Sequence, residues 1–280
     1  MPTFKSPCLF VLPLLLAAVF SWARDMQQPW VQVSSRHFTI ICQGNEKQAR
    51  RIGDQLERMR LVFKTTFPNL QVDPSAPVVV IVVKDQKAFR ALEPDDYLVK
   101  GGLELTGSFL RAPEKNYVLL RLDAGGNHPY ATVYHEYTQL LTSKAEFIPL
   151  WLNEGLAEFY ENTEVSGTEA VLGQADEGQI LWLRQNPLLP LLTLFTVDHN
   201  SPYYHQENKG SMFYAESWAL THYLQIKGAK ENKNYIRDYL LLVANQVDPV
   251  TAAGQALVTS SIFSRHSRLI SRNPASTPSS

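Results

Sequence analysis

Two short segments, ten residues apart, constrain this chain more than any other feature. The first is His135-Glu136-Tyr137-Thr138-Gln139, and the second runs over 149–159 as P-L-W-L-N-E-G-L-A-E-F. The first nearly spells H-E-x-x-H, in which two histidines on one helical face bind one zinc and the glutamate acts as general base. Gln139 stands where the second histidine would be. The question is therefore whether this chain builds a working metal site.

Length and composition place the chain among packed globular proteins. With 280 residues it has room for one large domain or two small ones. A hydrophobic content of 45% against 19% charged residues predicts a packed core over most of the length. The net charge is −1 and no long run carries one sign, which argues against a nucleic-acid-binding protein.

The N-terminus predicts a secretory signal peptide over residues 1–23. Lys5 supplies the positive start, the apolar run 9–20 follows, and Ser21-Trp22-Ala23 offers small residues for cleavage. The run has 12 residues, fewer than the ~20 that a membrane-spanning helix needs. An uncleaved membrane anchor is the alternative. No later segment predicts a membrane span.

The cysteines bear on the compartment. Cys8 lies inside the predicted signal, so Cys42 alone would remain in the mature chain and no intrachain disulfide is possible. The residues around Cys42 are typical of a buried strand. An exported protein without disulfides fits a bacterial envelope better than an animal extracellular space. We therefore expect the protein in the periplasm or outside a bacterial cell.

Hydrophobic periodicity predicts an α+β fold, in which a small mixed β-sheet is followed by a helical part. The apolar run 78–83 is typical of a buried central strand. Other strands are expected within 30–43, 105–111 and 117–122, and helices at 46–63, 87–92, 128–143, 149–161, 211–226 and 235–245, with short helices or turns near 180–183 and 188–195. We expect the domain to span 24–258. The Ser-, Arg- and Pro-rich residues 259–280 predict a disordered tail.

The spacing of the two central segments predicts one shared site. Positions i and i+4 of a helix share a face, so His135 and Gln139 could approach the same metal. Glu136 could take a proton from a water bound to that metal. Glu154 on the next helix could supply a third, anionic ligand. Glu158, one turn further, could accept a hydrogen bond from the other ring nitrogen of His135.

Gln139 is the weak point of this metal site. Its neutral amide oxygen is a poorer zinc ligand than an imidazole, a thiolate or a carboxylate. Zinc would therefore be weakly bound or absent unless Gln139 ligates through that oxygen. Alternatively, another histidine could approach in the fold, although none has ligand spacing to His135 and each is more often a surface or core residue: His128, His199, His205 and His222.

The two segments together resemble the gluzincin metallopeptidases, and most closely the bacterial peptidase MA-like family. There the pattern is roughly H-E-Y-T-H-L, a short linker, then P-L-W-L-N-E-G-L-A-E-F. This chain matches it at 135–138, at Leu140 and over 149–159, and departs from it at Gln139. The similarity extends over about 30–257. It also includes the segment F-Y-A-E-S-W-A-L at 213–220.

The resemblance implies an exported zinc metallopeptidase acting on a peptide or protein substrate. Glu136 would activate the metal-bound water, and Tyr214 would stabilise the oxyanion of the tetrahedral intermediate. Alternatively, Tyr214 and Trp218 are core aromatics at i, i+4. The competing functional hypothesis is a metal-poor pseudo-peptidase that keeps the fold as a peptide-binding or scaffold module. Gln139 favours the second hypothesis, whereas the intact Glu136 and Glu154 favour the first.

Overall fold

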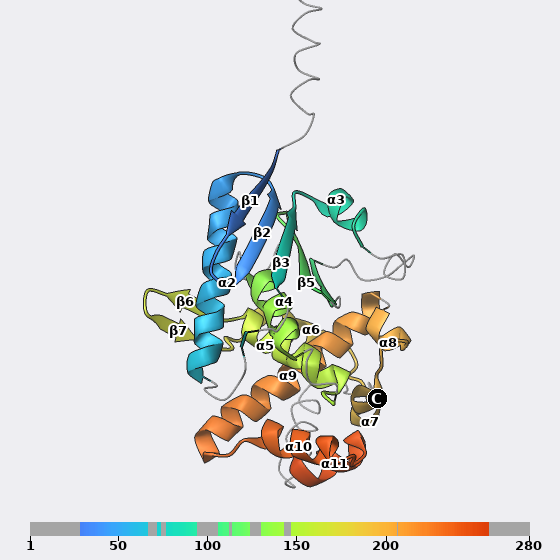
Figure 1. Cartoon of the computed structure of the whole chain (residues 1–280). Helices are drawn as coiled ribbons and strands as arrows, with labels where there is room; N and C mark the ends of the chain where they lie inside the picture. The colour runs from blue at the N-terminus through green and yellow to red at the C-terminus, as the bar shows by residue number, and fades with distance from the viewer. Residues whose placement is uncertain are drawn as a thin grey trace, which may run out of the picture.

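The protein is described here from a computed structural model (Figure 1). The structure describes residues 29–66, 72–73, 77–93, 106–111, 114–123, 130–142, 147–205 and 207–257. The predicted signal peptide and the predicted tail lie outside these residues. The sheet occupies one end of the molecule and most helices the other, so the predicted α+β class is confirmed.

The sheet is mixed and five-stranded, with the order β1-β2-β3-β5-β4. β1 and β2 are antiparallel, β2, β3 and β5 are parallel to one another, and β4 is antiparallel to β5. The strands are β1 (Trp30–Ser34), β2 (Phe38–Gln43), β3 (Val78–Val83), β4 (Gly107–Arg111) and β5 (Asn116–Arg121). β3 is central, as its continuous apolar run predicts, because both of its faces must be covered.

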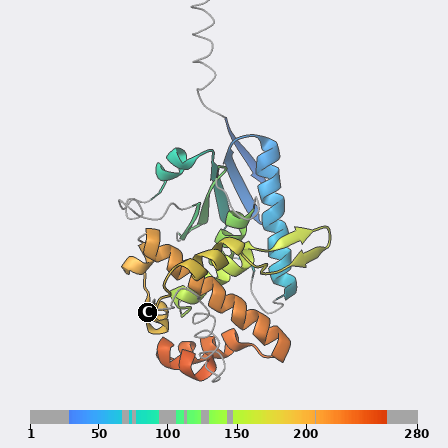
Figure 2. The same ribbon diagram turned by 180° about the vertical axis from the view of Figure 1, so that it is seen from behind.

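The helices fall into those that cover the sheet and those that form the second half of the molecule. The former are α2 (Glu46–Thr66), α3 (Gln86–Arg90) and α4 (Ala131–Thr142). The latter are α5 (Leu150–Glu161), α6 (Glu177–Gln185), α7 (Leu191–Thr196), α8 (Pro202–His205), α9 (Glu207–Glu231), α10 (Tyr235–Ala244) and α11 (Pro249–Ala256). A hairpin of β6 (Glu164–Ser166) and β7 (Glu169–Val171) projects beside α2 in both views (Figure 2).

Two hydrophobic cores meet at α4 and α5. The first lies between the sheet and α2 with α4, where the Tyr137 ring packs edge-on against Phe38 and Phe63 with centroids 5.6 and 5.9 Å away. The second is built around Trp151 of α5, whose ring contacts Phe195 and Tyr239. α5 contributes Phe159 and Tyr160 to the first core and Trp151 to the second, and it packs against α4 at the junction.

Several elements differ from the sequence prediction in extent. α9 begins at Glu207 and ends at Glu231, longer at both ends than the predicted 211–226. α11 and the β6–β7 hairpin were not predicted, because they are short and carry little periodicity. The predicted start of α4 near 128 lies outside the described residues. Among those residues, no helix combines the length and apolar character that a bilayer crossing requires.

Candidate functional site

The candidate site lies where α4 packs against α5. His135 and Gln139 are four residues apart on α4 and face α5. Glu154, Glu158 and Glu161 follow one another at i, i+4 and i+7 along α5, so they form a row on the side that faces His135. The imidazole therefore lies between a pair of polar groups on its Nε2 side and a pair on its Nδ1 side.

On the Nε2 side, three side chains form a closed triangle. Gln139 Nε2 lies 3.1 Å from His135 Nε2 and donates a 3.0 Å hydrogen bond to Glu154 Oε2. The third edge, from His135 Nε2 to Glu154 Oε2, is 3.6 Å. Glu154 is buried, with a relative exposure of 1%. The structure thus brings together the three residues that the sequence analysis named as metal ligands.

The size of this triangle suits a tetrahedral metal ion. Bonds of about 2.0–2.1 Å at a tetrahedral angle place ligand atoms roughly 3.3 Å apart, and the three observed edges are 3.0, 3.1 and 3.6 Å. A half-turn of the Gln139 amide would place its oxygen where its nitrogen now lies. The residues present therefore fit a zinc ion, provided that the amide turns.

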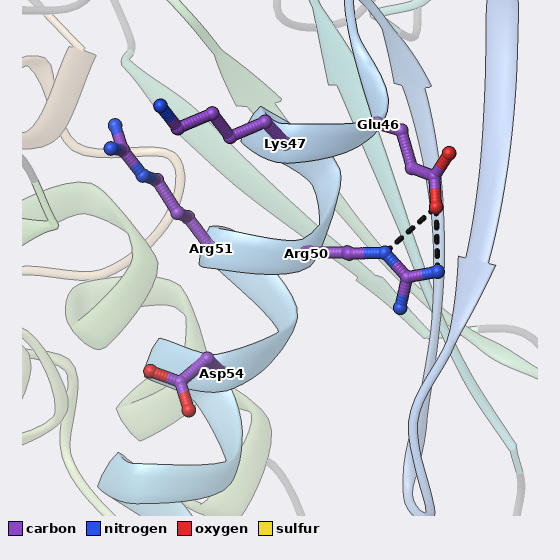
Figure 3. A pocket seen from close by; sticks show the side chains of 5 residues that line it. All are labelled: Glu46, Lys47, Arg50, Arg51 and Asp54. Atoms are coloured by element: carbon purple, nitrogen blue, oxygen red, sulfur yellow. Dashed lines mark hydrogen bonds and ion pairs between the residues drawn. The ribbon is translucent and has the colours of Figure 1, made fainter.

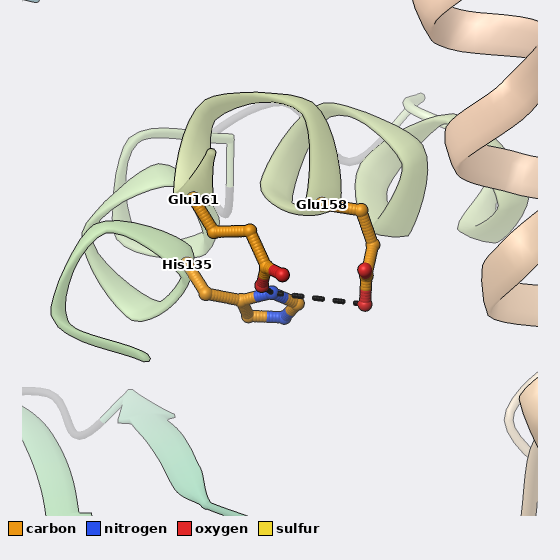
Figure 4. Close-up of side chains that lie close together, drawn as sticks. All are labelled: His135, Glu158 and Glu161. Atoms are coloured by element: carbon orange, nitrogen blue, oxygen red, sulfur yellow. Dashed lines mark hydrogen bonds and ion pairs between the residues drawn. The ribbon is translucent and has the colours of Figure 1, made fainter. Parts of the chain in front are cut away.

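On the Nδ1 side, Glu161 and not Glu158 is the close partner of His135 (Figure 4). The distance from His135 Nδ1 is 2.8 Å to Glu161 Oε2 and 3.9 Å to Glu158 Oε1. The predicted role of Glu158 is corrected accordingly. The reason is tertiary, because Gln179 of α6 donates a hydrogen bond to Glu158 Oε2 and holds that carboxyl. His135, Glu158 and Glu161 together form a second group of potential metal-ligating atoms, all within 4.8 Å of one another.

The electrostatics of the site follow from placing two buried carboxyl groups, Glu154 and Glu158, and the half-buried Glu161 around one imidazole. Burial by itself lowers the pKa of His135, but its interactions with Glu154 and Glu161 outweigh burial and raise that pKa well above its usual value. Burial and the nearby charge of Glu161 raise the pKa of Glu158 well above its usual value. A proton or a metal cation at the imidazole is therefore strongly favoured, and the two compete for Nε2.

Glu136 of α4 lies next to the edge strand β4 and interacts electrostatically with His135, Glu154 and Glu161. Its side chain lies against the backbone of Gly107 in β4 and is only 4% exposed. Burial raises the pKa of Glu136 to about 8. Its Oε2 atom has no hydrogen-bond partner among the described residues. An unpartnered buried carboxyl oxygen is uncommon, and within the described part of the chain Glu216 on α9 has one as well.

The tyrosine closest to the predicted ligands is Tyr204, which the sequence analysis missed. Its hydroxyl donates a 3.1 Å hydrogen bond to Glu154 Oε1. Tyr214 lies next to it, with ring centroids 5.9 Å apart, and burial followed by the charge of Glu154 raises its pKa well above the usual value. Trp218 is buried at 4% exposure, as the core-aromatic alternative expects. Tyr204 lies in a short helix without a motif, so no local signal could have found it.

Two of the four other histidines considered as possible ligands have surroundings that the structure describes. His222 packs between the rings of Phe159 and Trp218, and burial lowers its pKa. The ring of His199 packs edge-on against Tyr204, with centroids 5.3 Å apart. His128 and the side chain of His205 lie outside what the structure describes.

A surface hollow on the first turns of α2 is unrelated to this site (Figure 3). It is lined by charged side chains of one helix face: Glu46, Lys47, Arg50, Arg51 and Asp54. Glu46 pairs with Arg50, and Asp54 pairs with Arg58 further along the helix. Such i, i+4 pairs are ordinary features of a solvated helix surface, so the hollow adds no functional group to the site.

Comparison with known families covers the part of the chain that carries the site. The family described as "Protein of unknown function (DUF1570)" matches residues 130–241. The chain contains a DUF1570 domain. The match includes α4 to α9 and most of α10, and therefore His135, Gln139 and Glu154 with their partners. No curated protein matches the chain. The description of the DUF1570 family names no activity.

Proposed function

We propose that this chain is an exported zinc-dependent metallopeptidase of the gluzincin type, with a weakened metal site. The observation that carries the proposal is the triangle of His135, Gln139 and Glu154, whose edges of 3.0 to 3.6 Å suit a tetrahedral ion. The apolar N-terminal run with its small-residue cleavage site supports export.

Three side chains would hold the metal, and two others would orient them. His135 and Glu154 are strong zinc ligands, and Gln139 would bind through its amide oxygen. With zinc bound, the remaining proton of His135 would lie on Nδ1 and be donated to Glu161, and the Nε2 lone pair would face the triangle. Tyr204 holds the other oxygen of Glu154. Zinc bound there would act as a Lewis acid toward the scissile carbonyl group.

Glu136 is the candidate general base. Its carboxyl would take a proton from the attacking water and pass it to the leaving amine. The raised pKa, about 8, means that the carboxyl holds a proton at neutral pH unless a cation lies nearby. A cation bound at the triangle would favour the ionised form and so lower this pKa. Metal binding at the triangle and ionisation of Glu136 are therefore coupled.

The edge strand β4 provides a route for the substrate. β4 is the last strand of the sheet order, so no described strand pairs with its outer edge. Gly107 of this strand lies against the Glu136 carboxyl. An extended peptide that added to the edge by backbone hydrogen bonds would pass the base with its scissile bond.

One observation favours a second candidate, the metal-poor pseudo-peptidase. The Gln139 amide already closes the triangle, because its nitrogen donates to Glu154 and lies against the imidazole. The polar groups are then satisfied without an ion. In this case the edge strand would bind peptides without cleaving them.

The deciding experiment is zinc titration of the wild type and of Gln139→His by calorimetry. An imidazole at position 139 completes a three-ligand site, so the affinity should rise by more than the 10–100-fold that the loss of a ligand's hydrogen-bond partner typically costs. Hydrolysis of a fluorogenic peptide should rise with it. It should disappear in Gln139→His/Glu136→Gln, which keeps the shape but removes the base. Gln185→His, at an exposed position of α6, is the matched control and should bind zinc as the wild type does.

The outcomes separate the two candidates. Measurable peptide hydrolysis by zinc-loaded wild type supports the peptidase. Hydrolysis only after Gln139→His supports the pseudo-peptidase on a peptidase fold. Absence of zinc binding by both proteins would show that the triangle holds no metal, and both the peptidase proposal and its metal site would fail.

A further inference from the structure

Gly107 occupies an unusual place on the edge of the sheet. It is the first residue of β4, where it pairs with Leu120 of β5, and helix α4 packs against this strand. Strands favour β-branched and aromatic side chains, which glycine cannot supply. Such a glycine often marks a point where another group must approach the backbone closely.

The group that approaches is the candidate base. A Cβ atom added at Gly107 would lie 2.6 Å from Glu136 Oε1 and 2.7 Å from Glu136 Cγ. It would also lie 2.7 Å from the Cγ2 methyl of Thr132, one turn earlier on α4. Non-bonded carbon atoms prefer about 3.5–4.0 Å, so these contacts cannot be accommodated without movement.

The surroundings determine which group would move. β4 is held in register by β5, and α4 is anchored in the first core through Tyr137, which is fully buried. The Oε2 atom of Glu136 has no hydrogen-bond partner among the described residues, so no hydrogen bond from these residues anchors that oxygen. The carboxyl is therefore the part that would be displaced.

We propose that Gly107 is a positioning residue for Glu136, because the missing side chain at this one place on the edge strand forms the pocket that holds the carboxyl beside the substrate path. That Gly107 leaves space for the Glu136 carboxyl follows from the geometry alone. That this placement affects catalysis rests on the proposed peptidase function. No local motif indicates Gly107, since it lies 28 positions before His135 in the sequence.

The first test is a double-mutant cycle on thermal unfolding, which needs no enzymatic activity. Gly107→Ala, Glu136→Ala and the double variant are all made in a Thr132→Ser background. That background removes the Thr132 methyl but keeps the hydroxyl that donates to Thr106. Gly107→Ala should lower the Tm by several degrees while Glu136 is present and have little effect once Glu136 is alanine. Gly254→Ala, which meets no atom within 4 Å, is the control for replacing glycine.

The second test measures peptide hydrolysis and zinc affinity of Gly107→Ala. A base moved by about 1 Å can cost on the order of 100-fold in rate, so kcat should fall at least tenfold. Zinc affinity should stay within about twofold of wild type because the metal triangle does not touch Gly107. Gly254→Ala should keep the wild-type kcat.

The two tests fail in different ways. Equal Tm losses with and without Glu136 would overturn the proposal, since the glycine would then serve only the backbone. If the wild type is active and Gly107→Ala keeps the same kcat, the proposal is overturned as well. Should the wild type hydrolyse nothing, the proposed peptidase function fails, and the cycle alone decides whether Gly107 holds Glu136.

Discussion

Individual ligand side chains in this site are each oriented by a partner on another element. Glu161 of α5 contacts Nδ1 of His135 on α4, and Tyr204 of α8 donates to Oε1 of Glu154 on α5. Each contact fixes one atom of the side chain and directs the other atom at the triangle. If the proposed zinc binds here, Glu161 and Tyr204 would influence its affinity without touching it, because they hold His135 and Glu154 in place.

Replacement of Tyr204 by phenylalanine tests whether its hydroxyl orients Glu154. Tyr204→Phe removes the hydroxyl that holds Glu154 but keeps the ring, so zinc affinity should fall by about 10-fold, as expected for the loss of a ligand's hydrogen-bond partner. Calorimetric titration of the Gln139→His protein with and without this change measures the effect on a strong site. Tyr117→Phe, on β5, is the control, and an unchanged affinity in Tyr204→Phe would show that Glu154 needs no such support.

Among the elements, the crossing of α5 and α9 fixes the position of the row of glutamates. Gly155 follows Glu154 in α5, although glycine in a helix interior costs about 1 kcal/mol relative to alanine. A Cβ atom there would lie 2.2 Å from Thr221 Oγ1 and 2.4 Å from the backbone oxygen of Ser217 in α9. Glycine at this position lets the axes of α5 and α9 approach closely.

Gly155→Ala should therefore destabilise the protein despite the better helix propensity of alanine. The obstacle is a backbone atom, which cannot rotate away, so α5 would have to shift from α9. Overpacking of this kind costs about 1–3 kcal/mol or more in free energy of unfolding. Urea denaturation measures it. Gly254→Ala on α11, where the added methyl group meets nothing, should be neutral or slightly stabilising; a neutral Gly155→Ala would contradict the close crossing.

For the molecule as a whole, buried carboxyl groups lower the free energy of unfolding wherever they would otherwise ionise. Glu136, Glu154, Glu158 and Glu216 are all less than 10% exposed. Glu216 on α9 is fully buried, accepts a hydrogen bond from the Leu189 backbone and has no partner for Oε2 among the described residues. Burial raises its pKa from the ordinary 4.5 to about 7. It lies outside the metal triangle, so its titration can be measured separately.

The raised pKa of Glu216 predicts a stability that depends on pH. Below pH 4.5 the carboxyl is protonated in both the folded and the unfolded chain, so the raised pKa of Glu216 does not reduce the free energy of unfolding there. As the pH rises toward 7 the unfolded chain ionises first, so stability is lost, by at most about 3 kcal/mol. Glu216→Gln cannot ionise and should unfold at a higher temperature than wild type at pH 8 but not at pH 4.5. An equal difference at both pH values would contradict this assignment.

Local residue patterns predicted the α+β class, the central strand at 78–83 and the helices that carry His135 and Glu154. Periodicity and i, i+4 spacing are local properties, so they survive into the fold wherever a helix or strand forms. They placed His135 and Gln139 on one face and Glu154 on the next helix, and the structure has these side chains in contact.

Tertiary structure alone decided the partners of those residues. Glu161 displaces Glu158 as the contact of His135 because Gln179, from another helix, holds Glu158. Tyr204 reaches Glu154 across 50 positions, and Gly107 makes room for Glu136 from the edge of the sheet. Such contacts depend on how the packing of two cores aligns elements that are distant in sequence, and no local pattern of residues encodes that alignment.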